Sequence, residues 1–125
     1  MRVKNEDLLD QTGFISMASS FDMKPVWLGH IAYYSIQLVF IGTPTGNFKL
    51  QASNDLGSIN SASESNQDND ILNWTDIADS AQAITAGGDH MWTVENAGYN
   101  WVRVVWTQTA GTGTLISARC YVKGV

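Results

Sequence analysis

Residues 32–40 read AYYSIQLVF, a stretch in which a two-residue repeat is plain. Tyr34 and Phe40 belong to an even-numbered series that is apolar at every step, while Ser35 and Gln37 interrupt the odd-numbered series. Alternation of this kind is typical of a β-strand that buries one of its faces. The stretch therefore predicts a strand whose even-numbered side chains point into a hydrophobic core.

A turn is predicted at residues 42–46, where the sequence GTPTG places a glycine on either side of a proline. Turns favour both residues, because glycine tolerates positive φ and proline fixes φ. After the turn, Phe48, Leu50 and Ala52 alternate with polar side chains, as expected for a second strand. The two strands and their turn are interpreted as a β-hairpin.

The same arrangement recurs near the C-terminus. Val102, Val104 and Trp106 share one face of a dense strand, and the sequence TAGTG at residues 109–113 forms the next turn. A final strand follows, so residues 101–123 are interpreted as a second hairpin. The apolar alternation of the final strand predicts four buried side chains, namely Ile116, Ala118, Cys120 and Val122.

Shorter strands are predicted at residues 14–18, 26–28, 71–75 and 90–94. Residues 76–85 come nearest to a helical repeat, but the repeat does not hold over three turns. About seven or eight short strands separated by turn signals indicate an all-β fold. We therefore predict an antiparallel β-sandwich with a jelly-roll-like connection of its strands.

The chain has 125 residues, which is the usual size of one domain. Residues 14–125 are assigned to this single domain, whereas residues 1–13 have little apolar content and are interpreted as an extended N-terminal arm. Residues 54–70 are polar and contain few large apolar side chains, so an exposed loop is expected there. Most of this stretch, residues 57–70, forms a loop that is longer than the strand pattern leads us to expect.

Composition and charge argue against some partners. The net charge is -5, and the seven lysines and arginines are scattered rather than gathered in a stripe. An acidic surface repels phosphate backbones and anionic lipid headgroups, so neither nucleic acid nor a membrane surface is expected as a partner. The single cysteine, Cys120, lies in an apolar alternation and is expected to be a buried, inert thiol.

The motifs that carry catalysis or metal binding are incomplete. Neither His30 nor His90 stands in a nucleophile or metal-binding motif. The sequence NQDND at residues 66–70 resembles the start of a calcium loop, yet Ile71 replaces the required glycine and Ile77 replaces the required glutamate. The acidic residues select no pair for glycoside hydrolysis. We therefore expect no catalytic activity, no cofactor and no metal.

Five tryptophans are present. Trp92 and Trp106 fall on apolar faces and are expected in the core, whereas Trp27 and Trp101 are candidates for an interface with a protein or a sugar. Apolar side chains on outward faces suit subunit contacts, and cover by a loop or by the N-terminal segment is the alternative explanation. The interface candidates are Trp27, Tyr33, Val39, Ile41, Trp101, Arg103 and Val105.

Four blocks of sequence occur together in an order that resembles a known class of proteins. The blocks are SIQLV at residues 35–39, GTPTG leading to QASND at residues 42–55, NWTD at residues 73–76, and YNWVRVVW at residues 99–106 followed by GTGTL and a closing KG. Over residues 14–125, the chain resembles the small β-sandwich proteins that build or decorate the virions of tailed bacteriophages.

The resemblance implies a virion protein that is assembled in the host cytoplasm, decorates or cements the capsid surface, and has no enzyme activity. It implies a homo-oligomer, with a trimer favoured, and the major capsid protein or other virion proteins as partners. Residues 1–13 would then add to the edge of a neighbouring sheet. The alternative is a carbohydrate-binding or adhesion module of a phage tail or fibre, in which Trp27 and Trp101 would stack on a host surface glycan.

Overall fold

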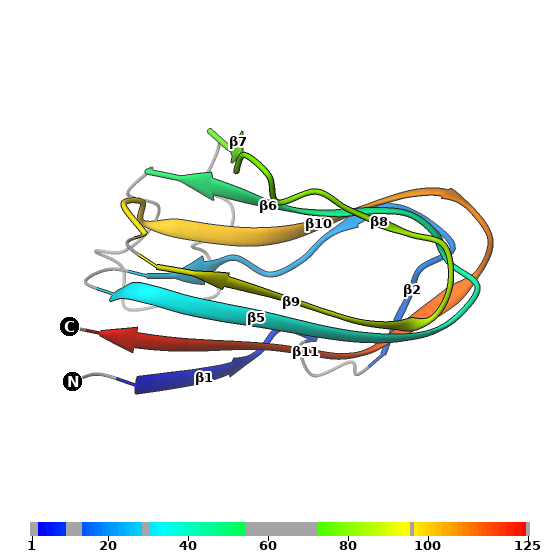
Figure 1. Cartoon of the computed structure of the whole chain (residues 1–125), viewed down its shortest axis with the longest axis horizontal. Coiled ribbons are helices and arrows are strands. Elements are labelled where there is room, and N and C mark those ends of the chain that lie inside the picture. The colour runs from blue at the N-terminus through cyan, green and yellow to red at the C-terminus, as the bar shows by residue number, and fades with distance from the viewer. Residues whose placement is uncertain (1–2, 10–13, 29–30, 55–72, 96, 125) are drawn as a thin grey trace.

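The computed structural model describes residues 3–9, 14–28, 31–54, 73–95 and 97–124. Within these residues the chain forms eleven β-strands and no helix, and the strands build two antiparallel sheets (Figure 1). The strands are β1 (Val3–Asp7), β2 (Ile15–Ser16), β3 (Phe21–Asp22), β4 (Val26–Trp27), β5 (Ile31–Gly42), β6 (Thr45–Ser53), β7 (Thr75–Asp76), β8 (Gln82–Ile84), β9 (Gly88–Val94), β10 (Trp101–Ala110) and β11 (Gly113–Gly124).

Each sheet is built on a path of four strands. Sheet A has the order β1-β11-β5-β9, and β2 also pairs with β11. Sheet B has the order β3-β10-β6-β7, with β4 also on β10 and β8 also on β6. The predicted all-β antiparallel sandwich is therefore confirmed. The strand count exceeds the expected seven or eight because residues 15–27 and 75–84 form strands of only two or three residues.

The two predicted hairpins are wrong, because the strands on either side of each turn belong to different sheets. β5 pairs with β11 and β9 in sheet A, whereas β6 pairs with β10 in sheet B. The turns at residues 43–44 and 111–112 therefore carry the chain from one sheet to the other. They lie beside each other, and the Thr43 amide donates a 2.8 Å hydrogen bond to the Thr112 carbonyl. A glycine–proline turn fits either a hairpin or such a crossing, and the partner strand decides between them.

Two further connections cross between the sheets at the same end of the molecule (Figure 1). Residues 17–20 lead from β2 to β3, and residues 85–87 lead from β8 to β9. The Gly87 amide donates to the Gly42 carbonyl at 2.9 Å, which ties the β8–β9 connection to the β5–β6 turn. The sandwich thus resembles a sheet of four long antiparallel strands folded in half, so that each long strand contributes one segment to each sheet. This agrees with the predicted jelly-roll-like connection of the strands.

The hydrophobic core lies between the two sheets. The even-numbered side chains of β5 from residue 34 to residue 40 are buried, as predicted, and Val102, Val104 and Trp106 of β10 face them from sheet B. The Trp106 ring packs against the Phe48 ring with 4.6 Å between their centroids. Its indole Nε1 donates a 3.1 Å hydrogen bond to the Met17 carbonyl, so the one polar atom of this large side chain is satisfied.

Two other core predictions are confirmed. Trp92 is buried, and its Nε1 donates to the Ser80 carbonyl at 2.8 Å. Cys120 is 1% exposed, and its thiol lies inside the hydrophobic core. A thiol in such surroundings is shielded from oxidants and electrophiles in the folded chain.

The prediction that Ile116 is buried is wrong, because β11 contains a β-bulge. Leu115 pairs with Phe40 and Ser117 pairs with Val39, so Ile116 is an extra residue without a partner on β5. A bulge shifts the alternation by one position. Leu115 is therefore fully buried in its place, while the three residues predicted after the bulge, Ala118, Cys120 and Val122, are buried as expected.

Leu115→Ala should therefore destabilise the protein more than Ile116→Ala. Truncation of a fully buried leucine costs about 2–5 kcal/mol, whereas the partly exposed Ile116 leaves a smaller cavity and should cost roughly half as much or less. Urea denaturation of the two variants, followed by tryptophan fluorescence, measures the difference. Equal losses, or a larger loss for Ile116→Ala, would show that β11 continues without a bulge.

Part of the N-terminal segment that was interpreted as an extended arm is described by the structure. Residues 3–7 form β1, which pairs with residues 119–123 of β11 at the edge of sheet A. Leu8 and Leu9 follow it and are 2% and 5% exposed. The local sequence is polar because an edge strand with one covered side needs few apolar residues, and Leu8 and Leu9 supply the anchor. This part of the predicted arm is joined to the sandwich of its own chain.

Some sequence-based expectations fall outside the described residues. They concern the loop at residues 57–70, the calcium-like sequence at residues 66–70, and His30. Of the polar stretch at residues 54–70, the structure describes Asn54, which is exposed as expected.

Candidate functional site

The predicted interface residues lie on two different faces of the sandwich rather than on one. Tyr33, Val39 and Ile41 lie on the outer face of sheet A, because they alternate with the buried side chains of β5. Arg103 and Val105 lie on the outer face of sheet B, because they alternate with the buried side chains of β10. The structure thus divides these candidates into two sets, and their part in protein contacts stays a prediction.

The outer face of sheet A carries apolar side chains among polar ones. Ile41 is 53% exposed, and Val39 on the same strand is half-buried. Met91, which the sequence argument did not select, is 52% exposed on β9 and pairs in register with Gln37 of β5. Its odd-numbered position in the predicted strand 90–94 is the signal that could have identified it.

Trp101 is not available on the surface, contrary to the expectation from its alternation with core residues. It is 1% exposed. Trp27 of β4 pairs with Trp101 of β10 in register, and the two ring centroids are 4.9 Å apart. Trp27 itself is half-buried. This contact could not be predicted from local alternation, because β4 and β10 are far apart along the chain.

A row of polar side chains crosses the outer face of sheet B. Arg103 donates from Nε to Gln51 Oε1 at 2.8 Å, and Gln51 donates from Nε2 to Asp76 Oδ1 at 2.8 Å. Lys49 Nζ lies 3.1 Å from the other carboxylate oxygen of Asp76. The register of β7, β6 and β10 places these groups opposite one another, so they link three strands across the sheet.

Arg103 is engaged on two further sides. Its guanidinium nitrogen lies 3.4 Å from the Asp22 carboxylate, and its central carbon lies 4.2 Å from the centroid of the Trp74 ring. Burial lowers the pKa of Arg103, and the negative charge of Asp22 opposes this effect. Arginine remains protonated at neutral pH despite such a change. This predicted contact residue therefore makes its charged contacts within its own chain.

The Asp76 carboxyl is expected to titrate below its usual range. Hydrogen bonds from Gln51 and then from Lys49 lower its pKa. The folded chain thus favours the charged carboxylate, which stabilises the fold at a pH above the usual carboxyl pKa. This stabilisation is lost as the pH falls through the lowered pKa of the folded chain. Carboxyl ¹³C shifts followed against pH measure the midpoint. Gln51→Leu should raise the titration midpoint of Asp76, whereas Gln37→Leu, on the other sheet, should leave it unchanged. Equal midpoints in the two variants would show that Gln51 does not lower the pKa of Asp76.

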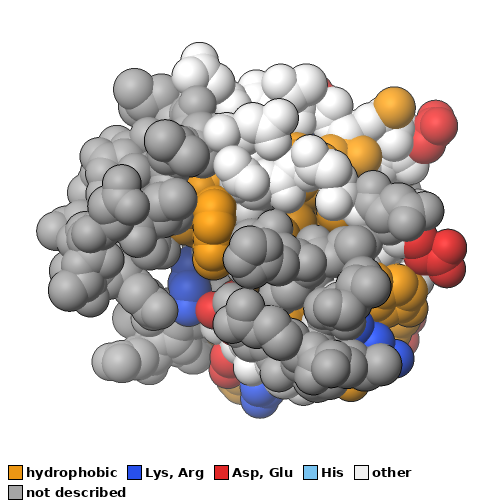
Figure 2. Space-filling model, turned by 90° about the vertical axis from the view of Figure 1, so that its left-hand side faces the viewer, with side chains coloured by type: hydrophobic (Ala, Val, Ile, Leu, Met, Phe, Trp, Pro, Cys, Tyr) orange, Lys and Arg blue, Asp and Glu red, His pale blue; other side chains and the backbone are white. Residues whose placement is uncertain are grey.

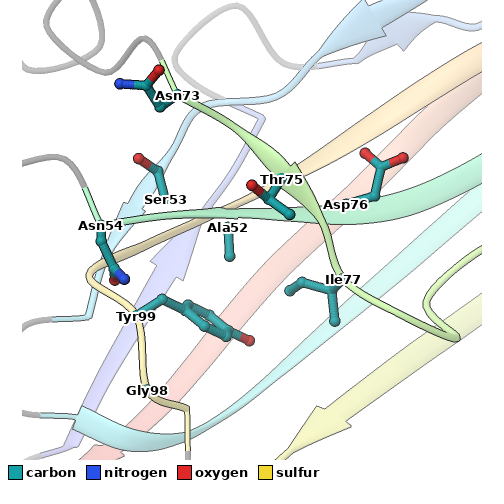
Figure 3. A pocket seen from close by; sticks show the side chains of 9 residues that line it. All are labelled: Ala52, Ser53, Asn54, Asn73, Thr75, Asp76, Ile77, Gly98 and Tyr99. Carbon is teal, nitrogen blue, oxygen red and sulfur yellow. The ribbon is translucent and has the colours of Figure 1, made fainter.

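A pocket of about 620 Å³ (Figure 3) lies at β7 and the end of β6, and Figure 1 shows these strand ends on the side away from the sheet-crossing turns. Its lining comes from three separate segments, between residues 52 and 54, between residues 73 and 77, and at residues 98–99. In Figure 3 these side chains come from the end of β6, from β7 and from the stretch before β10. In the view onto this end of the molecule, uncharged atoms form the larger part of the described surface (Figure 2).

Tyr99 is the aromatic side chain among the described residues that line the pocket. Its hydroxyl shares a 2.5 Å hydrogen bond with the hydroxyl of the fully buried Tyr34, and the two rings meet edge to face with centroids 6.3 Å apart. Burial is the main cause that raises the pKa of Tyr34, and burial also raises the pKa of Tyr99. Both phenols therefore stay neutral at physiological pH. The neutral Tyr99 side chain therefore lines the pocket, and its hydrogen bond to Tyr34 holds the ring in position.

The described residues hold no cluster of three or more His, Cys, Asp and Glu side chains that could bind a metal ion. His90 packs edge-on against the Trp92 ring at 4.6 Å between centroids, and partial burial lowers its pKa while Asp89 opposes the change.

In the parts of the chain that the structure covers, no helix is long and apolar enough to cross a membrane.

Comparison with known proteins gives similarity in fold but not in sequence. No family model and no curated protein matches the chain. Among solved structures, the SPBc2 prophage-derived protein YomS is similar with a TM-score of 0.52 and 13% identity, over 97% of this chain and 92% of that chain. Chitosan-binding module 1 of a chitosanase/glucanase from Paenibacillus sp. IK-5 has a TM-score of 0.50 and 17% identity, over 98% of this chain and 94% of that one.

A third similar structure comes from the Gx strain of infectious bursal disease virus. Its TM-score is 0.50 and its identity 15%; the match covers 97% of this chain but 31% of the viral chain. Identities this low show a shared β-sandwich fold and nothing further. The fold therefore occurs in proteins of phage and viral origin and in a polysaccharide-binding module.

Proposed function

We propose that this chain is a non-enzymatic structural protein of a bacteriophage particle, attached to the capsid surface. The observation that carries the proposal is the outer face of sheet A, where Ile41 and Met91 are each more than half exposed and Val39 lies on the same face. Exposed apolar side chains on one sheet face suit a surface where proteins meet. The partner at this face would be the major capsid protein or another virion protein.

Two independent similarities support this proposal. The four sequence blocks resemble small virion proteins of tailed phages, and the fold is like that of YomS, which derives from a prophage. A sandwich also suits a particle surface mechanically, because four crossing turns tie its two sheets together at one end. None of these features requires chemistry at the surface of the protein.

The test is whether labelled protein binds phage capsids from which it has been removed. The wild type should sediment with the capsids until a fixed number of sites is filled. The double variant Ile41→Asp with Met91→Asp should stay in the supernatant, because two charges at an apolar contact must be desolvated without partners. Failure of the wild type to bind any capsid would contradict the proposal.

The matched control places the same two charges on the other sheet. Asn47 and Thr107 are exposed and pair in register between β6 and β10. Asn47→Asp with Thr107→Asp should bind capsids as the wild type does. If both double variants bind equally, or both fail, the contact face is not the outer face of sheet A.

We also propose that the protein is a homo-oligomer, with a trimer favoured. Residues 3–7 already pair with β11 of their own chain, so the proposed contacts do not require the N-terminal segment to join a neighbour. Light scattering after gel filtration should give three times the 13.7 kDa mass of one chain. A single-chain mass over a hundredfold range of protein concentration would contradict the oligomer.

A further inference from the structure

The chemistry of the pocket at the end of the sandwich points to a ligand class that the virion proposal does not require. The geometry points to a binding site for a short neutral saccharide, formed by Asn54, Asn73, Thr75 and Tyr99. This inference rests on the pocket alone, so it stands or falls independently of capsid attachment.

The polar part of the lining consists of groups that both donate and accept hydrogen bonds. Asn54 and Asn73 contribute amides, and Ser53 and Thr75 contribute hydroxyls, from three strands or strand ends around one opening (Figure 3). A sugar ring carries hydroxyls that donate and accept in the same way. Amide and hydroxyl side chains can pair with them without a charge on either partner.

The apolar part of the lining matches the other feature of a sugar, its C–H faces. Ala52, Ile77 and the ring of Tyr99 line the same pocket, and all three are partly buried (Figure 3). An aromatic ring provides a flat apolar surface against which a sugar ring can lie. Because the hydroxyl of Tyr99 is bonded to Tyr34, the ring is held in place before a ligand arrives.

The charge of the pocket argues against anionic ligands. Among the described residues, the lining contains no lysine or arginine that could pair with a phosphate or carboxylate. The acid among the described lining residues, Asp76, is already bonded to Gln51 at 2.8 Å and paired with Lys49 at 3.1 Å. Because the Asp76 charge is already paired with Lys49, the site offers no uncompensated charge to an ion, and a neutral ligand is favoured.

The frame of the pocket is fixed by backbone hydrogen bonds. The Asn100 amide donates to the Ser53 carbonyl at 3.1 Å, and its side chain donates to the Asn54 carbonyl at 3.2 Å. The Ile77 amide donates to the Leu50 carbonyl at 2.9 Å. The three lining segments are thus joined to one another, and the volume of about 620 Å³ lies within the range of small-ligand sites.

Calorimetric titration of the whole protein with cellotriose, maltotriose and the trimer of N-acetylglucosamine tests the inference. At least one of these neutral probes should bind, and trigalacturonic acid should bind at least tenfold more weakly than it. The exposed-residue variants Asn54→Ala and Thr75→Ala should each weaken binding roughly three- to tenfold, the loss expected for one hydrogen bond. Asn47→Ala and Thr107→Ala, the same substitutions at exposed sites on sheet B, should leave binding unchanged.

The role of the Tyr99 ring is separated from that of its hydroxyl by two substitutions. Tyr99→Phe keeps the ring and should retain binding within about threefold, whereas Tyr99→Leu should lose it by more than about tenfold. Circular dichroism of both variants checks the fold. Absence of binding to all three neutral probes would overturn the ligand class. Binding that survives in the Asn54→Ala and Thr75→Ala double variant would overturn the site.

Discussion

Gly111→Ala is expected to lower the free energy of unfolding by about 2–5 kcal/mol, because two separate costs fall on the same residue. Gly111 has a φ of +73°, a conformation that alanine adopts only with strain. A Cβ atom at this position would also collide with the Thr43 carbonyl oxygen in the neighbouring crossing turn. Neither backbone can move freely, since Thr43 is bonded to Thr112. The substitution therefore forces the two sheet-crossing turns apart.

Gly88→Ala is the matched control for this prediction. A Cβ atom at Gly88 would meet nothing within 4 Å, and the residue lies in strand β9. The same change there should leave the stability unchanged or raise it by up to about 1 kcal/mol, because alanine restricts the unfolded chain. Chemical denaturation followed by circular dichroism measures both variants. Similar stabilities for the two would mean that residues 43 and 111 are not in contact.

Trp106→Ala is expected to have the second large effect, a loss of about 3–5 kcal/mol. The side chain is fully buried, packs on Phe48 at 4.6 Å between centroids, and bonds the Met17 carbonyl at 3.1 Å. Its removal leaves a large cavity and an unpaired carbonyl between the two sheets.

Trp74→Ala serves as the comparison, since it deletes the same side chain at a half-buried site. Trp74 covers the Arg103 guanidinium at 4.2 Å on the outer face of sheet B. Loss of this cation–π contact should cost about 0.5–1 kcal/mol. Thermal unfolding of both variants measures the difference. A loss at Trp74 as large as that at Trp106 would contradict the placement of the core.

The inner faces of the strands could be predicted from sequence because they depend on local alternation. Tyr34, Phe48 and Trp106 are buried as their two-residue repeats indicate. The bulge at Ile116 could not be predicted, because an extra residue is defined only by the register of the partner strand. The sheet crossings at residues 43–44 and 111–112 could not be predicted for a related reason. The same glycine and proline residues are suited to a hairpin turn and to a turn that crosses between sheets.

The candidate sites were less accessible to sequence reasoning than the core. Trp101 is buried and lies against Trp27, which the pairing of β4 with β10 brings beside it. The pocket draws on Asn54, Thr75 and Tyr99, which lie in separate segments and share no motif. Sheet topology, rather than any local pattern, brings these side chains to one end of the sandwich.

The most direct test of the sheet-crossing arrangement is a set of backbone nuclear Overhauser effects measured on the isotope-labelled protein. The structure predicts contacts between Leu50 and Val104 in sheet B and between Leu38 and Ala118 in sheet A, as their registers require. Backbone contacts that instead pair Leu38 with Lys49, as a hairpin closed at residues 43–44 demands, would contradict the folded-over sandwich and the core and pocket that depend on it.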